Sequence, residues 1–236
     1  MYHRPMIRRT WLLEMAWLVF ALPQVSACAA QTPPLVPPPA LDNPHAAGAP
    51  QSAVLAGGCF WGVQGVFEHL KGVQRVLSGY SGGQAGTAHY EIVGRGRSGH
   101  AESVQITFDP KQVSYGQILQ LFFTVAHDPT QLDRQGPDVG PQYRSVIFYA
   151  DDAQKRIAEA YIGQLEQSKV FPAPIVTRLQ PLTGFYAAEG YHQDYLLTNP
   201  YDPYIVQNDL PKISYFRQIL PHLYRAQPVR VVAARF

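Results

Sequence analysis

Residues 53–72 read AVLAGGCFWGVQGVFEHLKG, and this run predicts a strand, a tight turn and a helix in immediate succession. The short apolar stretch 53–56 is typical of a buried strand, and the glycines after it permit a sharp turn. From Phe60 onward, apolar residues recur at helical spacing until Gly72, which suits the end of a helix. The apolar positions are Val63, Val66, Phe67 and Leu70. The run therefore places Cys59 at the start of a helix.

The pattern on either side of this run predicts the fold class. Further strands are expected at 73–79, 103–108 and 144–150, with an edge strand at 175–179. Amphipathic helices are expected after the N-cap residue Ser114 and over 151–168. The first six elements give β-α-β-β-α-β, the order of a ferredoxin-like split βαβ sheet with helices on one face. We predict an α+β fold, with the later helix and long C-terminal loops added to that unit.

Composition limits the size of the domain and its partners. The chain has 236 residues, of which 46% are hydrophobic and 15% charged, as expected of one folded domain with appendages. The formal net charge of +2 is too small for the basic surface that nucleic-acid binding needs. We therefore expect no nucleic-acid partner.

Residues 1–27 have the layout of an export signal. Arg4, Arg8 and Arg9 precede an apolar run at 15–22, which is shorter than the roughly 20 residues of a membrane-spanning helix. The sequence VSAC at 25–28 resembles a bacterial lipobox, in which Cys28 would carry lipid. Ordinary cleavage beside the neighbouring alanines is the alternative. The chain is thus expected in the periplasm or as a membrane-anchored lipoprotein.

Three further segments follow the signal. Residues 28–51 are rich in proline and alanine and predict an extended, semi-rigid linker. Residues 52–212 form the expected catalytic domain. In the tail at 213–236, arginines lie among apolar residues. That tail is expected to pack as a closing arm, and contact with an anionic surface is the alternative.

The second cysteine of the chain, Cys59, has no obvious disulfide partner once the signal is processed. An unpaired cysteine is either a small buried hydrophobe or a reactive thiol, and its own presence favours neither. At a helix start, free backbone N–H groups and the helix dipole stabilise a thiolate. Phe60 and Trp61 offer flat apolar surface suited to a methyl group or thioether. Core packing of the two rings around an inert cysteine is the alternative.

The sequence GCFWG at 58–62 is similar to the signature of the A-type peptide methionine sulfoxide reductases. Other blocks of the chain resemble that family in the same order, and the likeness runs from about residue 54 to about residue 212. They are GYSGG at 79–83, HYE at 89–91, GHAE at 99–102, HDP at 127–129, QYRS at 142–145, YHQDY at 191–195 and NDLPK at 208–212.

The resemblance implies roles for single residues. Cys59 matches the nucleophile of the family, and Glu102 matches the acid that lies near the substrate oxygen. Tyr90 and Tyr143 match hydroxyls that hydrogen-bond this oxygen, and Asp138 matches an aspartate that helps to order the site. The wall that receives the methyl group is matched by Phe60 and Trp61. Outside this context, Glu102 would be interpreted as a surface carboxylate and both tyrosines as half-buried structural residues.

The chemistry explains this combination of residue types. Attack of a thiolate on a sulfoxide sulfur moves negative charge onto the oxygen, which leaves only when it is protonated. A carboxylic acid and phenols are therefore needed on one side of the substrate and apolar surface on the other. An apolar pocket disfavours ionisation of Glu102 and so suits it to donate a proton. The expected products are methionine and a sulfenic acid on Cys59, and the resemblance implies the S epimer of the sulfoxide.

The chain departs from many relatives in its cysteines. Relatives often carry resolving cysteines near the C-terminus, but residues 195–236 contain none, and Gly94 occupies another position where relatives often have one. We expect an external thiol, either a thioredoxin-like protein or a small thiol, to reduce oxidised Cys59 directly. Resolution by Cys28 is disfavoured. No metal or organic cofactor is expected, because the histidines lack ligand spacing.

The loop that carries Asp138 is rich in proline. Pro137 and Pro141 flank Asp138 where the family more often has polar residues, and they stiffen that loop. The expected substrates are oxidised proteins or peptides, and the chain is expected to be a monomer.

Two alternative functions remain at this point. A thiol peroxidase or thiol transferase would also use a helix-start cysteine, and a non-catalytic surface lipoprotein could keep the same scaffold.

Overall fold

A six-stranded sheet of order β7-β6-β1-β3-β2-β8 forms the centre of the domain. The computed structural model describes residues 1, 34–43 and 48–231, so the predicted export signal and Cys28 lie outside the described residues, apart from Met1. The strands are β1 Gln51–Gly57, β2 Val73–Ser81, β3 Ala101–Phe108, β6 Ser145–Tyr149, β7 Arg178–Pro181 and β8 Phe185–Ala187, with a separate hairpin of β4 Arg134–Gln135 and β5 Asp138–Val139. The main helices are α1 Phe60–Glu68, α2 Tyr90–Val93, α3 Tyr115–Leu121, α4 Asp152–Ser168, α5 Tyr195–Thr198 and α6 Leu210–Ile219.

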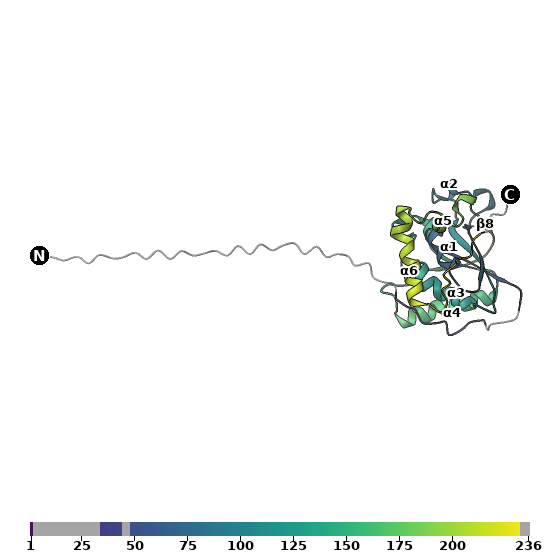
Figure 1. Cartoon of the computed structure of the whole chain (residues 1–236), viewed down its shortest axis with the longest axis horizontal. Helices are drawn as coiled ribbons and strands as arrows, with labels where there is room; N and C mark the ends of the chain where they lie inside the picture. Colours follow the sequence, from purple (N-terminus) through teal and green to yellow (C-terminus); the bar gives the residue numbers. More distant parts are fainter. Residues whose placement is uncertain (2–33, 44–47, 232–236) are drawn as a thin grey trace. The chain divides into compact units, whose positions relative to one another are not determined.

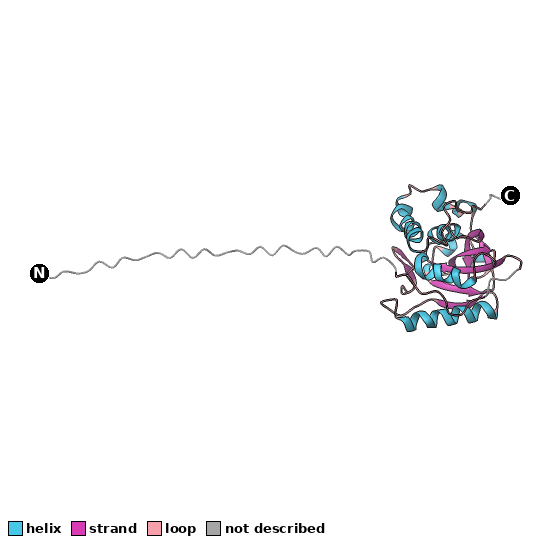
Figure 2. Cartoon of the chain, turned by 60° about the horizontal axis from the view of Figure 1, so that its bottom comes forward, coloured by secondary structure: helices cyan, strands magenta, loops and turns pink. Residues whose placement is uncertain are grey.

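The order of these elements confirms the predicted α+β fold. The antiparallel strands β6-β1-β3-β2, with α1 and α3 between them along the chain, form the split βαβ unit. Figure 2 shows helices packed against the strands, and Figure 1 labels α1, α3 and α4, whose apolar side chains share one core on the same face of the sheet. Helix α3 begins where expected, because Ser114 and Gln117 form a reciprocal capping box. Among the described helices, none is both long and apolar enough to cross a membrane.

The edge strands differ from the prediction. The strand expected at 175–179 forms at 178–181 and pairs in parallel with β6. The earlier residues do not join the sheet, because the Val176 N–H donates to the Pro129 carbonyl. Strand β8 was not predicted, since three residues are too short to show an alternating pattern.

Strand β1 is apolar from Ala53 to Ala56 because both of its faces are covered there. Ala53 and Leu55 belong to the large core that also contains side chains of α1, α3 and α4. Val54 and Ala56 point to the other face and pack in a smaller cluster with Phe148. A strand buried on both faces gives a continuous apolar run, which is why 53–56 showed no alternation.

Residues 34–43, which lie in the extended, semi-rigid linker predicted at 28–51, belong to the compact unit of the domain. Val36 is fully buried in the large core. The Tyr161 hydroxyl donates to the Pro37 carbonyl at 2.7 Å, and the Gly116 N–H donates to Asp42 Oδ1 at 2.8 Å. Proline removes backbone donors but leaves its carbonyls free to accept, so a proline-rich segment can pack on helices α3 and α4. The folded unit thus begins well before the expected residue 52.

The described part of the tail also packs on the domain. Helix α6 spans the expected boundary at residue 212 and lies beside α1 (Figure 1). Beyond it, Tyr224 forms a bridge with Leu70, and the Val229 N–H donates to the Glu68 carbonyl at 3.0 Å. These contacts lie at the C-terminal end of the helix that begins beside Cys59.

Candidate active site

Cys59 lies at the junction of β1 and α1, as the N-cap residue of that helix. The turn before it requires glycine. Gly58 has a φ of +96°, and a Cβ there would come within 2.5 Å of the Gln135 side chain. The short strand and the turn therefore place the sulfur at the tip of α1, where it is partly exposed.

A small pocket of about 160 Å³ opens onto Cys59. All seven residues that the sequence nominated line this pocket, and one further tyrosine completes it. The lining residues are Cys59, Phe60, Trp61, Tyr90, Glu102, Asp138, Tyr143 and Tyr204. The volume suits one side chain.

The polar side chains reach the pocket from four different segments. Glu102 is the second residue of β3, and Tyr90 is the first residue of α2. Tyr143 ends the 3₁₀ turn at Pro141–Tyr143, and Asp138 lies on strand β5. Because these segments are far apart in sequence, their meeting at Cys59 depends on the whole fold.

Glu102 is buried and has the properties of a proton donor. Its side chain is 3% exposed, and Oε2 accepts a hydrogen bond from the Phe60 N–H at 3.1 Å. Burial raises the pKa of Glu102 to about 8, against the opposing effect of the Phe60 N–H, and the nearby Asp138 carboxylate raises it further. The carboxyl therefore keeps its proton at neutral pH.

The thiol of Cys59 differs from the prediction made from its place on the helix. Burial raises its pKa well above the ordinary value, and the Glu102 and Asp209 carboxyls raise it further. The Trp61 N–H acts in the opposite direction but does not outweigh them. The expected stabilised thiolate is thus wrong for the free site, where Cys59 rests as a thiol.

The two phenols face the same carboxyl. Burial raises the pKa of Tyr143 and of Tyr90, and the proximity of Glu102 adds to both shifts. Both hydroxyls therefore remain protonated and able to donate. Together with Glu102, they supply three proton-bearing groups to the pocket.

The apolar lining of the pocket, Phe60 and Trp61, is held by residues outside the pocket. The Trp61 ring stacks on Tyr195 with ring centroids 3.8 Å apart and planes 11° apart. Its Nε1–H donates to His192 Nδ1 at 3.1 Å, and the His192 ring lies 4.9 Å from the Phe60 ring. A tryptophan fixed by a stack and a hydrogen bond presents a rigid face to the pocket.

From the sequence alone, no role was assigned to Tyr204, His192 or Tyr195. The Tyr204 hydroxyl donates to the Asp138 carboxylate and so fixes it beside the pocket. His192 and Tyr195 belong to the YHQDY block at 191–195, which carried a resemblance but no role. Tyr204 lies between the last two blocks of the resemblance, in the run Tyr201-Asp202-Pro203-Tyr204. The surplus of tyrosines there is the one signal that pointed to it.

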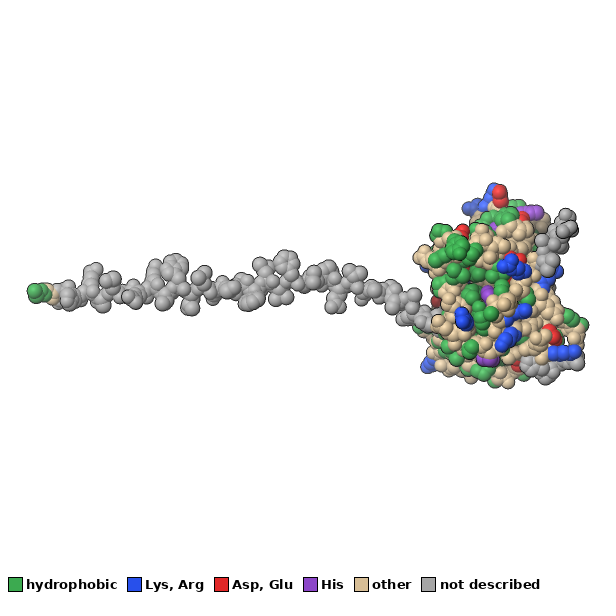
Figure 3. All heavy atoms as spheres, viewed as in Figure 1, with side chains coloured by type: hydrophobic (Ala, Val, Ile, Leu, Met, Phe, Trp, Pro, Cys, Tyr) green, Lys and Arg blue, Asp and Glu red, His purple; other side chains and the backbone are tan. Residues whose placement is uncertain are grey.

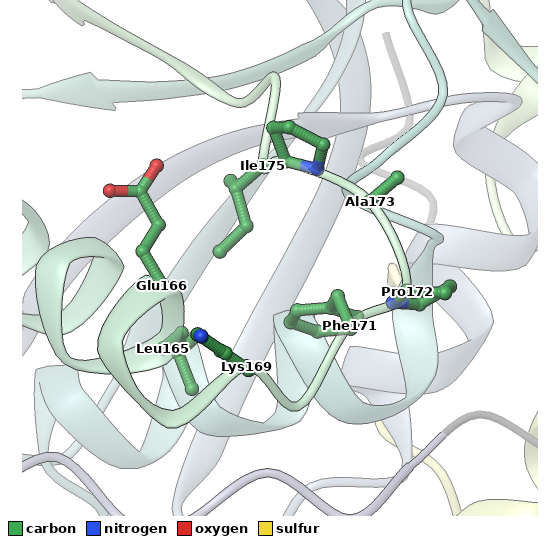
Figure 4. Close-up of a pocket in the computed structure, with 8 residues that line it drawn as sticks. Leu165, Glu166, Lys169, Phe171, Pro172, Ala173 and Ile175 are labelled. Atoms are coloured by element: carbon green, nitrogen blue, oxygen red, sulfur yellow. The ribbon is translucent and has the colours of Figure 1, made fainter.

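Other hollows in the described residues lack this chemistry. A pocket of about 370 Å³ lies at the C-terminal end of α4, where Leu165, Phe171 and Ile175 surround it and Glu166 and Lys169 stand at its edge (Figure 4). Its lining contains neither a cysteine nor a tyrosine. In the described part of the chain, no group of three or more His, Cys, Asp or Glu residues could hold a metal ion. On the face seen in Figure 3, Lys and Arg side chains are scattered among apolar and polar residues.

The pocket can protonate an oxygen atom while a neighbouring sulfur attacks the atom that carries it. The fold and the site thus define the class of protein: it is a reductase that uses a thiol to remove an oxygen atom from its substrate. The chain belongs to the peptide methionine sulfoxide reductase family, whose model matches residues 51–222.

Individual relatives support the same assignment. The chain is 59% identical over 184 residues to the peptide methionine sulfoxide reductase MsrA 2 of Mesorhizobium japonicum, covering 78% of this chain and 94% of that protein. It is 49% identical to the MsrA 2 of Synechocystis, over 82% of this chain and 92% of that protein. Among solved structures, it is similar to methionine sulfoxide reductase A of Corynebacterium diphtheriae, with a TM-score of 0.57, 32% identity, and coverage of 71% of this chain and 89% of the other.

Proposed function

We propose that this chain reduces methionine-S-sulfoxide in oxidised polypeptides to methionine, with Cys59 as the nucleophile. The observation that carries the proposal is the meeting of Glu102, Tyr90 and Tyr143 around one pocket with the Cys59 sulfur. A thiol peroxidase would need the thiol, but it would not need the rigid Trp61 face for a methyl group. The apolar wall therefore favours a thioether oxide over a peroxide.

The geometry suggests how oxygen moves in the first half of the reaction. The Cys59 sulfur attacks the sulfoxide sulfur, and Glu102 protonates the oxygen while both tyrosine hydroxyls hydrogen-bond it. The hydroxyl then passes from the methionine sulfur to the Cys59 sulfur, so the methionine S–O bond and the transient S–S bond both break, which leaves a sulfenic acid on Cys59 and releases methionine. The proton lost by the thiol restores the proton of Glu102. Cys59 is thereby oxidised by two electrons and the sulfoxide is reduced by two.

The resting thiol fits this scheme. With Cys59 neutral, the free site oxidises slowly, because the thiolate is the reactive form. The bound sulfoxide oxygen accepts the proton of Glu102, and the resulting carboxylate can then take the proton of the thiol. We infer that attack is coupled to the presence of substrate in this way.

An external thiol completes the proposed cycle. Cys59 is the one cysteine among the described residues. A thiol of a thioredoxin-like protein or a small thiol attacks the sulfenic sulfur and releases water, which leaves a mixed disulfide. A second thiol then attacks this disulfide and frees Cys59. This single-cysteine cycle rests on the absence of cysteines from residues 195–236 and on Gly94.

The sulfoxide epimer gives the sharpest test of the proposed function. Reduced protein with excess dithiothreitol should convert the S epimer of a blocked methionine sulfoxide and leave the R epimer untouched, as separated by chiral chromatography. Free methionine-S-sulfoxide in a parallel reaction shows whether a peptide context is needed. Reduction of hydrogen peroxide with no reduction of either epimer would assign the chain to the thiol peroxidases instead.

We further propose that residues 1–27 direct export and that Cys28 carries the lipid of a membrane-anchored lipoprotein. The support is the sequence pattern of basic residues, apolar run and VSAC. The intact mass of the mature chain purified from membranes should equal residues 28–236 plus a lipid moiety. A mature chain that begins after Cys28, or one without added mass, would exclude lipidation.

A further inference from the structure

Arg144 is a buried cation that binds only backbone carbonyl groups in the described structure. The residue is 7% exposed to solvent. Nη1 donates to the His100 carbonyl at 3.0 Å and to the Pro141 carbonyl at 2.8 Å, and Nη2 donates to the Gly99 carbonyl at 2.8 Å. Within the described residues, no carboxylate forms an ion pair with it.

This arrangement is costly for the stability of the domain. Removing a guanidinium from water carries a desolvation penalty that neutral carbonyls offset only in part. The cost is visible in the pKa of Arg144, which burial lowers and the nearby Arg178 lowers further. An apolar side chain would avoid the penalty but would leave three carbonyls without donors. A lysine could not reproduce the planar fork. The presence of an arginine at this position thus indicates that the three carbonyls must be held in a defined geometry.

The guanidinium joins three of the sequence blocks that matched the family. Arg144 itself belongs to the block QYRS at 142–145, its fork binds two carbonyls of the block GHAE at 99–102, and the block GYSGG at 79–83 packs against it through Gly82. Gly82 has a φ of +94°, and a Cβ there would come 3.0 Å from Nη2 and 3.2 Å from the Gly99 carbonyl oxygen. The glycine therefore lets one loop lie directly on the fork.

Two of the joined segments lead directly to the proposed proton donors. Gly99 and His100 immediately precede β3, whose second residue is Glu102. Pro141 begins the 3₁₀ turn whose last residue is Tyr143. The bonds from one guanidinium thus tie together the two backbone segments that carry the carboxyl and one phenol of the site.

We propose that Arg144 is a positioning residue that sets the distance and orientation between the Glu102 carboxyl and the Tyr143 hydroxyl. This inference rests on the proposed function, because it assigns Arg144 to the protonation of the sulfoxide oxygen. Arg144 does not touch the pocket itself. Its effect passes through the backbone at positions 99, 100 and 141.

The first test is the kinetics of Arg144→Ala in the full chain with a blocked methionine-S-sulfoxide and dithiothreitol. We expect kcat to fall by about 10²-fold, since a misplacement of the order of 1 Å has that effect on a reacting group. KM should change much less, because Phe60 and Trp61 keep their contacts with α5 and His192.

A pH profile separates positioning from a loss of folded protein. Loosening the loops admits water to Glu102, which lowers the penalty on its carboxylate and therefore its pKa. Because Glu102 must be protonated, the alkaline decline of kcat should move to lower pH in Arg144→Ala. Lower stability alone would reduce kcat by one factor at every pH and leave the midpoint in place. The titratable groups that face Glu102 are Cys59, Asp138, Tyr80, Tyr90 and Tyr143, and those that act on Arg144 are Arg178 and Asp133.

Guanidinium rescue and a matched control complete the design. Free guanidinium, well below denaturing concentrations, should bind in the space left by Arg144→Ala and raise kcat several-fold. Arg144→Lys should stay below the parent, because it keeps the charge and loses the fork. Arg178→Ala removes a neighbouring arginine that pairs with Asp133 on the surface, and it should keep the parental kcat and show no response to guanidinium.

The outcomes are distinguishable. A folded Arg144→Ala with parental kcat and pH midpoint would overturn the positioning role while leaving the proposed function intact. A drop that follows the folded fraction alone, measured by circular dichroism, with no guanidinium rescue would overturn it as well. If the parent chain reduces neither sulfoxide epimer, it is the proposed function that fails.

Discussion

Glu102→Gln is expected to lower kcat by roughly 10²- to 10⁴-fold, the usual contribution of a general acid. Glutamine keeps the size of the side chain and can still donate a hydrogen bond, but it cannot transfer a proton to the sulfoxide oxygen. KM should change little, because the methyl wall of Phe60 and Trp61 is untouched. The measurement is the initial rate with a blocked methionine-S-sulfoxide at saturating dithiothreitol.

The sign of the pH effect follows from the pKa of the same carboxyl. Burial raises the pKa of Glu102 to about 8, so its fraction protonated falls as pH rises through that value. Because only the protonated form can act as the acid, kcat of the parent should decline above about pH 8. Glu102→Gln should show its low kcat without this decline.

Glu68→Gln is the matched control. Glu68 lies at the other end of α1 and is also buried, and burial together with Asp194 raises its pKa to about 9. Losing that carboxyl should leave kcat and its alkaline decline at the parental values. An equal drop in kcat for both variants would assign the effect to helix α1 as a whole and contradict a specific acid role for Glu102.

Most of the fold was predictable because its central elements carry strong local signals. The strand at 53–56, the capped helix after Ser114 and the helix at 151–168 each combine an apolar pattern with a clear start or stop. The proline-rich residues 34–43 could not be placed in the same way. Their docking depends on carbonyls and on one buried valine that meet α3 and α4 only in the folded chain.

The members of the site were predictable as a set, whereas their electrostatics were not. The pattern GCFWG and the later blocks named seven residues that the structure brings into one pocket. A helix start lowers the pKa of a thiol in isolation, but burial in the folded site raises the pKa of Cys59, and the carboxyls of Glu102 and Asp209, which come from distant segments, raise it further. Likewise, the carbonyls that Arg144 joins are separated by more than 40 residues. Local sequence gives no signal for such convergence.

Cys59→Ser is expected to remove turnover altogether, a loss of at least about 10⁴-fold when judged by other catalytic nucleophiles. A serine hydroxyl neither attacks the sulfoxide sulfur at a useful rate nor accepts its oxygen to form a reducible product. The substitution replaces one atom in a partly exposed side chain, so the variant should remain folded. Cys28→Ser is the control, and it should keep parental turnover with dithiothreitol.

One single-turnover experiment tests the central claim, that the lone thiol of Cys59 takes the oxygen itself. Reduced Cys28→Ser protein is mixed with excess blocked methionine-S-sulfoxide in the absence of reductant. We expect one methionine per chain, the gain of one oxygen atom in the intact mass, and a sulfenic acid that a dione reagent traps on Cys59. Methionine formed without oxygen on Cys59, or formed equally by a chain that also carries Cys59→Ser, would contradict the account.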